Sequence, residues 1–475
     1  MFKMKILLIT PPWFNDTVLD NLVSKNPPLG LAYIAAVLER DGYKDIKIID
    51  MRTSKIPIDN IGEHISNFKP DIIGMYVTTG QVISVTKIIK IIKSIDPKIL
   101  CVVGGPHPSV LPEETLKETN TDIVVLGEGE ITMLELVKAI EKKKSLNKVL
   151  GLYYKKNGKI IFTGRRPNIK DLDTLPFPAR HLLPNISLYS DGHSIHESKI
   201  HAQVMSSRGC PFQCTFCDNS VYGNTIRMRS AKSTVDEVEF LINKYPIKEI
   251  RFFDDLFTAN KQRVIDICDE LAKRNIKINW CCEARVTTVT PELLAIMKKG
   301  GCWAVSYGME SGSQDILNML KKNIKLEEIE RAVKWTKEAG LTVRGYFMIG
   351  LPGDTEETIK KTIKFAMKLK LDHVVFSLFS PYPGTEVYKN PGKYGVVNAK
   401  KWDEYMSLGK NPSFVPYGLT ANQLEKYYKR AYLLFYLRPK NILGIIKRIH
   451  SFSTFKQYFK AFLWTLKDSR LAKNE

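Results

Sequence analysis

Short apolar runs alternate with amphipathic stretches along most of this chain, and this alternation constrains the fold more than any other feature. In the first part, the runs KILLIT, KIID, DIIGMYV, ILCVVGG and DIVVLG are separated by stretches such as LGLAYIAAVLERDG. Near-continuous apolar strands joined by helices are typical of a parallel sheet that is covered on both faces. We therefore expect residues 1–150 to form an α/β domain, a Rossmann-like, doubly wound parallel sheet.

The alternation pauses after residue 150 and then returns. GLYYKKNGKIIFTG carries an Asn-Gly pair between two strand-like runs, which predicts a β-hairpin, and a proline-rich stretch without periodicity follows it. We therefore expect residues 151–200 to be a hairpin and a linker. Six strand and helix units follow in residues 201–390. Because a complete α/β barrel has eight, we expect a partial (β/α)6 barrel with its active site at the carboxyl ends of the strands.

The C-terminal region, residues 391–475, is predicted to be helical and basic. Residues 421–475 hold twelve Lys and Arg against three Asp and Glu, in a chain whose net charge is +21. Aromatic residues interleave with these charges: Tyr427, Tyr428, Tyr432, Phe435, Tyr436, Phe452, Phe455, Tyr458, Phe459, Phe462 and Trp464.

Two interpretations of this basic region stay open. Its helices pack their aromatic residues on the barrel with lysines in solvent, or they form a peripheral contact with an anionic membrane or an acidic partner. The charge also suits nucleic acid, but no RNA-binding module accompanies it, so a nucleic-acid partner is not expected.

The chain is expected to be cytoplasmic, with a peripheral membrane contact as the one exception. It contains no run of about 18 apolar residues, and its N-terminus lacks the small-residue cleavage site of a signal peptide. Three of its eight cysteines lie within eight residues and the others are scattered. This distribution favours a reducing compartment and one metal site over a disulfide framework.

The clustered cysteines, Cys210, Cys214 and Cys217, form a C-x-x-x-C-x-x-C motif directly after the first predicted barrel strand. Three thiolates on one loop can bind three irons of a 4Fe-4S cluster and leave the fourth iron open for chemistry. The alternatives are a zinc knuckle or buried thiols. A closed zinc site would need a fourth ligand, and no cysteine or histidine follows Cys217 within fifty residues.

A second cluster is a further hypothesis, raised by Cys281, Cys282 and Cys302. Cys281 and Cys282 are neighbours on a predicted strand, so their side chains point to opposite faces. We therefore expect these three thiols to lie in the core.

The cysteine spacing, with the aromatic Phe216 before the last cysteine, resembles the radical S-adenosylmethionine superfamily over residues 201–390. The resemblance implies that the open iron chelates the methionine amino and carboxylate groups of S-adenosylmethionine. One electron then breaks the sulfonium bond and gives a 5′-deoxyadenosyl radical. A reductase or a donor of the flavodoxin or ferredoxin type is the implied source of that electron.

The same resemblance implies further S-adenosylmethionine-binding residues at strand ends. Asp254 or Asp255 is expected to contact the methionine amino group, Glu310 the ribose, Arg344 the carboxylate and Gly350 the adenine. Each also has a structural alternative: a helix N-cap for the aspartates, an ion pair for Glu310, a solvated strand end for Arg344 and a turn for Gly350.

Glycine-containing segments follow three strands of the first domain, where they let a bulky ligand approach the backbone. No G-x-G-x-x-G follows the first strand, so a dinucleotide is not expected. These segments resemble the cobalamin-binding domain that precedes the radical core in one branch of the superfamily. The resemblance implies cobalamin contacts at Pro28, Leu29, Gly30, Gly104, Gly105, Gly127 and Gly129.

A histidine ligand to cobalt is not expected, because the D-x-H-x-x-G motif that supplies it elsewhere is absent from residues 1–150. The sequence from Asp191 to His193 begins like this motif but lies in the linker and lacks the final glycine. His107, in GGPHPS, is expected to be a partly exposed loop residue rather than a corrin contact.

These resemblances imply an enzyme that transfers a methyl group, by way of cobalamin, to an unactivated carbon of a small-molecule or lipid-like substrate. The same architecture hosts oxidative cyclases that resemble the anaerobic magnesium-protoporphyrin ester cyclase, and carbon-carbon bond-forming enzymes on porphyrin or lipid substrates. A non-catalytic cobalamin or cluster sensor is the remaining alternative. The strand-end candidates Glu310 and Arg344 favour catalysis.

Overall fold

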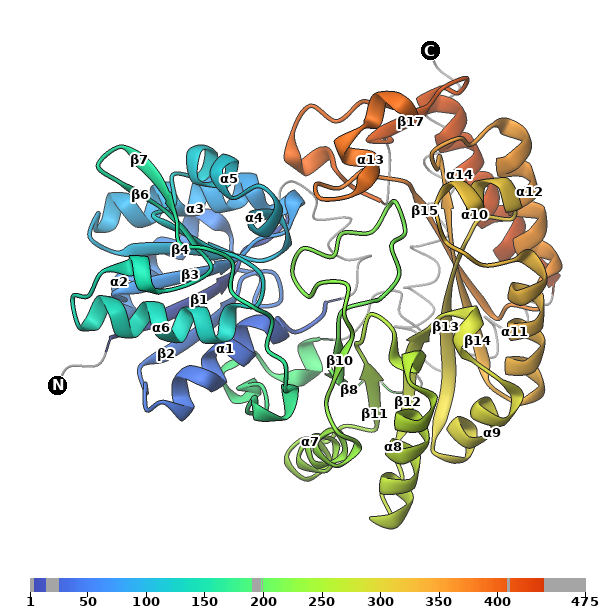
Figure 1. Ribbon diagram of the computed structural model, residues 1–475, viewed down its shortest axis with the longest axis horizontal. Coiled ribbons are helices and arrows are strands. Elements are labelled where there is room, and N and C mark those ends of the chain that lie inside the picture. Colours follow the sequence, from blue (N-terminus) through green and yellow to red (C-terminus); the bar gives the residue numbers. More distant parts are fainter. Residues whose placement is uncertain (1–3, 14–24, 190–197, 199, 408–410, 440–475) are drawn as a thin grey trace.

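The computed structural model describes residues 4–13, 25–189, 198, 200–407 and 411–439. It contains two α/β sheets side by side, and all strands of the first precede those of the second in the chain (Figure 1).

The first sheet has seven strands in the order β2-β1-β3-β4-β5-β6-β7. Five of them are parallel: β1 (Ile6–Thr10), β2 (Ile46–Asp50), β3 (Ile72–Tyr76), β4 (Leu100–Gly104) and β5 (Ile123–Val125). One face packs on α1 (Leu29–Arg40) and α6 (Gly129–Glu141), and the other on α2 (Ile61–Phe68), α3 (Val82–Ile95) and α5 (Pro112–Thr119). The predicted Rossmann-like, doubly wound sheet is therefore confirmed, and the loops after its parallel strands meet at one carboxyl edge.

The predicted hairpin forms, from β6 (Leu152–Lys156) to β7 (Lys159–Phe162), with Asn157 and Gly158 at positive φ in the turn. It belongs to the first sheet and not to the connecting segment, because β6 pairs antiparallel with β5. The first α/β unit thus extends beyond residue 150. The local sequence pattern predicts the hairpin. It does not predict which strand the hairpin pairs with, because β5 lies about thirty residues earlier in the chain.

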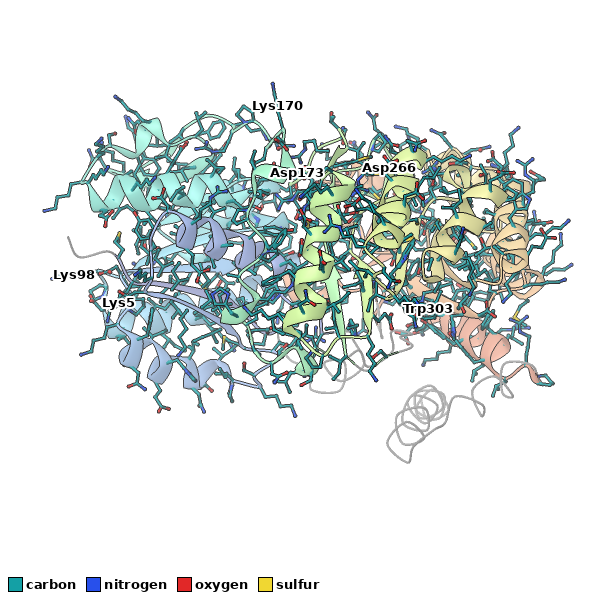
Figure 2. The ribbon with its side chains drawn as sticks, turned by 90° about the horizontal axis from the view of Figure 1, so that it is seen from below. Lys5, Lys98, Lys170, Asp173, Asp266 and Trp303 are labelled. Atoms are coloured by element: carbon teal, nitrogen blue, oxygen red, sulfur yellow. The ribbon has the colours of Figure 1, made fainter. Side chains whose placement is uncertain are left out.

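The segment after the hairpin is packed against both sheets by its side chains. Leu172 and Leu175 are buried on α1, and the buried Arg180 forms an ion pair with Glu237 at 2.6 Å. Asp173 lies between the two domains (Figure 2), where its carboxylate accepts a hydrogen bond from the Ser230 backbone at 3.0 Å. This segment therefore fixes the first sheet to the start of α7 (Ala231–Lys244).

The second sheet has six parallel strands in the order β15-β14-β13-β12-β11-β8. They are β8 (His201–Val204), β11 (Glu249–Phe252), β12 (Asn279–Ala284), β13 (Cys302–Glu310), β14 (Thr342–Ile349) and β15 (His373–Leu378). The helices between them are α7, α8 (Lys261–Lys273), α9 (Pro291–Lys299), α10 (Gln314–Met319), α11 (Leu326–Glu338) and α12 (Glu356–Lys368). The predicted partial (β/α)6 barrel is confirmed.

Alternate residues of these strands face opposite sides. Ile250, Trp280 and Cys282 belong to the large core that also includes the buried side chains of the surrounding helices, whereas Cys281 packs with Trp303 on the other face. The expectation that Cys281 and Cys282 point to opposite faces is therefore confirmed. These thiols are buried, as predicted for core cysteines.

The last strand, β15, is covered by α14 (Ala421–Tyr436), which lies along it (Figure 1). Tyr428 and Phe435 are buried in the barrel core. The packing interpretation of the basic region is thus confirmed for α14, and the remaining aromatic residues, from Phe452 onward, lie outside the described residues.

The C-terminal region is not helical throughout, because a two-stranded antiparallel ribbon forms from β16 (Gly395–Val397) and β17 (Phe414–Pro416). It follows the short helix α13 (Glu386–Lys389). A single turn between these strands, Trp402–Glu404, returns to the first domain, where the Trp402 indole donates to Glu118 at 2.6 Å. Over the described residues, no helix combines the length and the apolar composition needed to cross a bilayer.

Candidate active site

The three clustered cysteines lie on a long loop between β9 (Ser207–Arg208) and β10 (Arg227–Met228), two short strands that pair with each other. This loop follows β8 at the carboxyl side of the barrel and runs between the two domains (Figure 1). A Cβ atom at Gly209 would lie 2.6 Å from the Thr225 carbonyl, and φ there is +88°, so glycine is required at the start of the loop. The backbone of the loop therefore passes close to its own returning end directly before Cys210.

Cys214 is buried, Cys210 is partly buried and Cys217 is exposed. A hydrogen bond from the Cys217 side chain lowers the pKa of Cys214 to about 6, against the effect of burial, and the same bond raises the pKa of Cys217. Three thiols on one loop fit a cluster, which offers a separate iron to each.

Two buried cations that the sequence did not single out lie beside this loop. The Arg285 guanidinium is 3.7 Å from the Phe212 ring centre and donates to the Asn323 carbonyl at 3.2 Å. The Lys322 ammonium is 5.6 Å from the centre of the Phe216 ring. The Nε atom of Arg285 is buried without a hydrogen-bond partner in the described part of the chain. Arg285 directly follows β12. Its position at the carboxyl end of a predicted strand is the sequence signal that could have marked it as a candidate site residue.

The structure separates the two aspartates that the sequence treated together. Both oxygens of Asp254 are buried and occupied, by the Ser206 backbone (2.6 Å) and by the hydroxyls of Ser206 (2.6 Å) and Ser207 (2.7 Å). Asp255 is exposed, and one of its oxygens accepts from the Gly209 backbone at 3.1 Å. Neither aspartate caps a helix. Among the described residues, the second carboxylate oxygen of Asp255 accepts no hydrogen bond, so it can meet a ligand next to the cysteine loop, whereas Asp254 holds the strand that leads into this loop.

Glu310 ends β13 with φ at +63°, where the register with β14 shifts. Its Oε1 atom forms a buried ion pair with Lys322 at 2.7 Å, which is the structural alternative named for this residue.

Gly350 lies in a turn, which is the structural alternative named for this glycine. Its φ is +80°, and its backbone N–H donates to Asp354 at 3.1 Å. Burial raises the pKa of Asp354 to about 6.

Arg344 does not lie at a strand end. It stands five residues before the end of β14, about 16 Å along the strand, level with Ser306. It is half-buried and contacts Tyr346, whose hydroxyl donates to Glu283 at 3.1 Å. The expectation that Arg344 meets the methionine carboxylate is therefore not supported by its position, because the sequence pattern gave the strand but not where it ends.

The first domain presents the predicted cobalamin segments at its carboxyl edge. Pro28, Leu29 and Gly30 begin α1, and a Cβ atom at Gly30 would meet no atom of the described residues within 4 Å. Gly104 ends β4, and Gly105 has φ at +115°. Two buried polar atoms at this edge, Oγ1 of Thr10 and Nε2 of His107, have no hydrogen-bond partner in the described part of the chain. Open space and unpaired polar atoms at this edge fit a large polar ligand such as cobalamin.

The glycines after β5 have a different environment. A Cβ atom at Gly127 would lie 3.6 Å from the Val221 carbonyl of the cysteine loop, and one at Gly129 would lie 3.0 Å from Ile34 on α1. Gly127 therefore faces the second domain, and Gly129 allows α6 to pack closely on α1.

His107 is not a partly exposed loop residue, as the sequence suggested. It is 1% exposed in the short helix α4 (Pro106–Val110), with its ring 4.8 Å from that of Trp402. Burial lowers the pKa of His107 to about 4. Its cover comes from a residue almost three hundred positions later, which local sequence does not reveal. The other histidine considered, His193 with Asp191, lies outside the described residues.

Comparison with known proteins agrees with this arrangement. Residues 204–366 match the Radical SAM superfamily, and residues 15–137 match the B12 binding domain. The chain is 38% identical to an uncharacterized methyltransferase of Pyrococcus horikoshii, over 95% of this chain and 96% of that protein. It is 30% identical to an anaerobic magnesium-protoporphyrin IX monomethyl ester cyclase of Rubrivivax gelatinosus, over 90% of this chain and 78% of the cyclase.

The fold has a solved counterpart in TsrM, a radical S-adenosylmethionine methyltransferase from Kitasatospora setae. The TM-score is 0.71 at 18% identity, and the match covers 92% of this chain and 90% of TsrM. The chain is thus an enzyme of the radical S-adenosylmethionine superfamily, in the branch with an N-terminal B12 binding domain, and its cofactors are a 4Fe-4S cluster, S-adenosylmethionine and cobalamin.

Proposed function

We propose that this enzyme transfers a methyl group to an unactivated carbon of a small-molecule or lipid-like substrate. One observation carries the proposal: the cysteine loop lies against the carboxyl edge of the first sheet, with Val221 next to Gly127. Ligands of α/β sheets and barrels bind at the carboxyl ends of the strands. Both cofactor-binding edges therefore face one another, and a substrate between them can reach both.

In this proposal Cys210, Cys214 and Cys217 hold the cluster. Asp255 accepts a hydrogen bond from the methionine amino group, because it is the exposed aspartate of the pair and lies beside Gly209. Phe216, Glu310 and Gly350 line the rest of the site, with Glu310 oriented by Lys322. When bound to the reduced cluster, S-adenosylmethionine supplies a 5′-deoxyadenosyl radical.

The methionine carboxylate needs a cation, and Arg285 takes this role in place of Arg344. Arg285 is next to the cysteine loop, and its Nε atom has no hydrogen-bond partner among the described residues, whereas Arg344 is the third residue of β14, near the amino end of that strand. A guanidinium matches a carboxylate with two parallel hydrogen bonds.

We assign the corrin to the edge formed by Pro28, Leu29, Gly30, Gly104 and Gly105, which leaves room at Gly30. Gly127 and Gly129 border this edge but serve the contacts with the cysteine loop and α1 described above. No histidine ligand from a D-x-H-x-x-G motif is proposed.

The overall reaction uses two molecules of S-adenosylmethionine. One loses its methyl group and leaves as S-adenosylhomocysteine. The other takes one electron and a substrate hydrogen atom and leaves as methionine and 5′-deoxyadenosine. The donor supplies a second electron, because the methyl group leaves its sulfonium as a cation equivalent and joins a substrate radical, so each turnover consumes two electrons. The 38% identity to a protein named as a methyltransferase favours this reaction over the cyclase chemistry of the relative at 30%.

The electron donor is proposed to be an acidic protein of the flavodoxin or ferredoxin type, or a reductase. The net charge of +21 favours association with such a partner. A peripheral membrane contact stays a prediction for residues beyond α14.

The products separate methyl transfer from cyclisation. The reconstituted enzyme would be incubated with a chemical reductant, cobalamin, S-adenosylmethionine and a small-molecule extract of the source cells. Methyl transfer predicts that the extract raises S-adenosylhomocysteine and 5′-deoxyadenosine in equal amounts. A rise in 5′-deoxyadenosine alone would contradict methyl transfer and favour the cyclase. An Asp255→Asn variant serves as the control, because it should lower 5′-deoxyadenosine release.

A further inference from the structure

Two glutamates of the first domain bond directly to the base of the cysteine loop. Glu128 and Glu130 stand where β5 leads into α6, in the sequence LGEGE. Arg208, two residues before Cys210, donates from Nη1 to Glu128 at 2.7 Å and from Nη2 to Glu130 at 2.6 Å. All three side chains are at most 5% exposed, so this contact is buried between the domains.

The other end of the loop meets the same carboxylate. Arg227, which pairs with Arg208 across the β9-β10 ribbon, donates to Glu128 at 2.8 Å and to the Ile169 carbonyl at 2.6 Å. The Ile169 backbone in turn donates to Glu128 at 2.7 Å. The chain therefore enters and leaves the cysteine loop at arginines that share one glutamate of the first domain.

Aromatic rings complete the enclosure of Arg208. The Tyr33 ring of α1 lies 5.0 Å from the guanidinium carbon, and the Tyr222 ring of the cysteine loop lies 5.4 Å away. A guanidinium with two carboxylates in its plane and rings beside it has little freedom to move. Burying four charges costs solvation energy, so such a network is weak evidence for stability but suits the selection of one geometry.

We propose that Glu128 and Glu130 are positioning residues that fix the cysteine loop against the carboxyl edge of the first sheet, and so set the distance between cluster and corrin. The inference rests on the proposed function for the identity of the two cofactors. The positioning role explains why glutamates alternate with Gly127 and Gly129, two glycines that the sequence analysis predicted to be ligand contacts. The glycines allow close approach, and the glutamates bond across the interface.

The test compares Glu128→Gln and Arg208→Lys with Glu135→Gln. Glutamine keeps the shape of Glu128 without its charge, and lysine keeps the charge of Arg208 without its two-pronged geometry. Glu135 is a matched control, because it lies on α6 and pairs with Arg166 without touching the cysteine loop. Each protein would be loaded with cluster and cobalamin and reduced by one electron at the cluster while cobalamin is kept as Co(II), so that each cofactor holds an unpaired spin. The distance between the two spins would then be measured by pulsed dipolar electron paramagnetic resonance.

The wild type and Glu135→Gln should give the same narrow distance distribution. Glu128→Gln and Arg208→Lys should give a broadened or shifted one at unchanged cobalamin content, or should lose the cluster while keeping cobalamin. Distributions identical to the wild type in both variants would overturn the proposal.

A second measurement covers variants that bind neither cofactor. Hydrogen exchange of the apoprotein is then compared over residues 206–228, where both variants should exchange at least tenfold faster than Glu135→Gln. Equal exchange would overturn the proposal. If the wild type releases no 5′-deoxyadenosine, the proposed function fails, but the distance and exchange comparisons still decide the positioning role.

Discussion

The hydroxyl of Tyr432 bonds to both backbone groups of Phe376: it donates to the carbonyl at 2.8 Å and accepts from the N–H at 3.1 Å. Tyr436, one helical turn later, does the same with Val374, at 2.8 Å and 3.4 Å. Four residues along a helix span about 6 Å, and two residues along a strand span nearly the same distance. The two tyrosines of α14 therefore occupy hydrogen-bonding positions that another strand would fill, and they close this edge of the barrel.

Removal of the Tyr432 hydroxyl tests this closure. Tyr432→Phe should lower the free energy of unfolding by about 1–3 kcal/mol, because it leaves a buried N–H and a buried carbonyl without partners. The shift is measured from the urea midpoint at unchanged slope. Tyr427→Phe is the control, since its hydroxyl bonds to the Glu356 side chain instead of the strand backbone, and its loss should cost less than about 1 kcal/mol. Equal effects would show that the strand contact adds nothing.

Substitution of the two adjacent aspartates should affect different properties: protein stability for Asp254 and S-adenosylmethionine binding for Asp255. Asp254→Asn should destabilise the protein by about 1–3 kcal/mol, because three donors lose a buried carboxylate. Asp255→Asn should change stability by less than about 0.5 kcal/mol and weaken S-adenosylmethionine binding about tenfold, or 1.4 kcal/mol. Calorimetric titration of the cluster-loaded proteins and urea unfolding give both quantities. Unchanged affinity in Asp255→Asn would remove this residue from the site.

The ion pair between Glu310 and Lys322 is nearly fully buried, so loss of one partner leaves an unpaired charge. Lys322→Met should cost about 3–5 kcal/mol of unfolding free energy, and the double variant with Glu310→Gln should cost less than the single one. Urea unfolding of the two single variants and the double variant measures the coupling. Additive effects would mean that the two side chains do not interact.

The raised pKa of Asp354 should make the free energy of unfolding depend on pH. Burial raises its pKa from 3.8 to about 6, so the folded protein binds a proton that the unfolded chain has already released between these values. Stability from this group is therefore greatest at low pH and falls as pH rises from about 4 to about 6, by roughly 3 kcal/mol in total. Compared with Asp354→Asn, the wild type should lose stability across this window and stay level above it. A difference that is flat from pH 4 to 6 would contradict this effect.

The sequence was sufficient for the parallel strands and helices of both sheets, because buried parallel strands and amphipathic helices leave periodic local patterns. It also placed the cysteine motif on a loop after a strand and gave Cys281 and Cys282 opposite faces. These features depend on neighbours in the chain.

The features that sequence reasoning missed depend on contacts between distant residues. The hairpin joins the first sheet through β5, and His107 is covered by Trp402. Asp254 and Asp255 look alike in sequence, yet the register of β11 buries one and exposes the other. Arg208 and Arg285 are single arginines in segments without periodicity, so only the folded chain shows their partners.

The most direct test of the account is anaerobic reconstitution with iron and sulfide, followed by reduction with S-adenosylmethionine and hydroxocobalamin present. The wild type should bind a 4Fe-4S cluster, retain cobalamin and release 5′-deoxyadenosine. Cys214→Ala should release none, whereas Cys281→Ala, which alters a buried thiol that packs with Trp303, should still release it. A wild type that forms the cluster but releases no 5′-deoxyadenosine, or equal release from Cys214→Ala, would contradict the account.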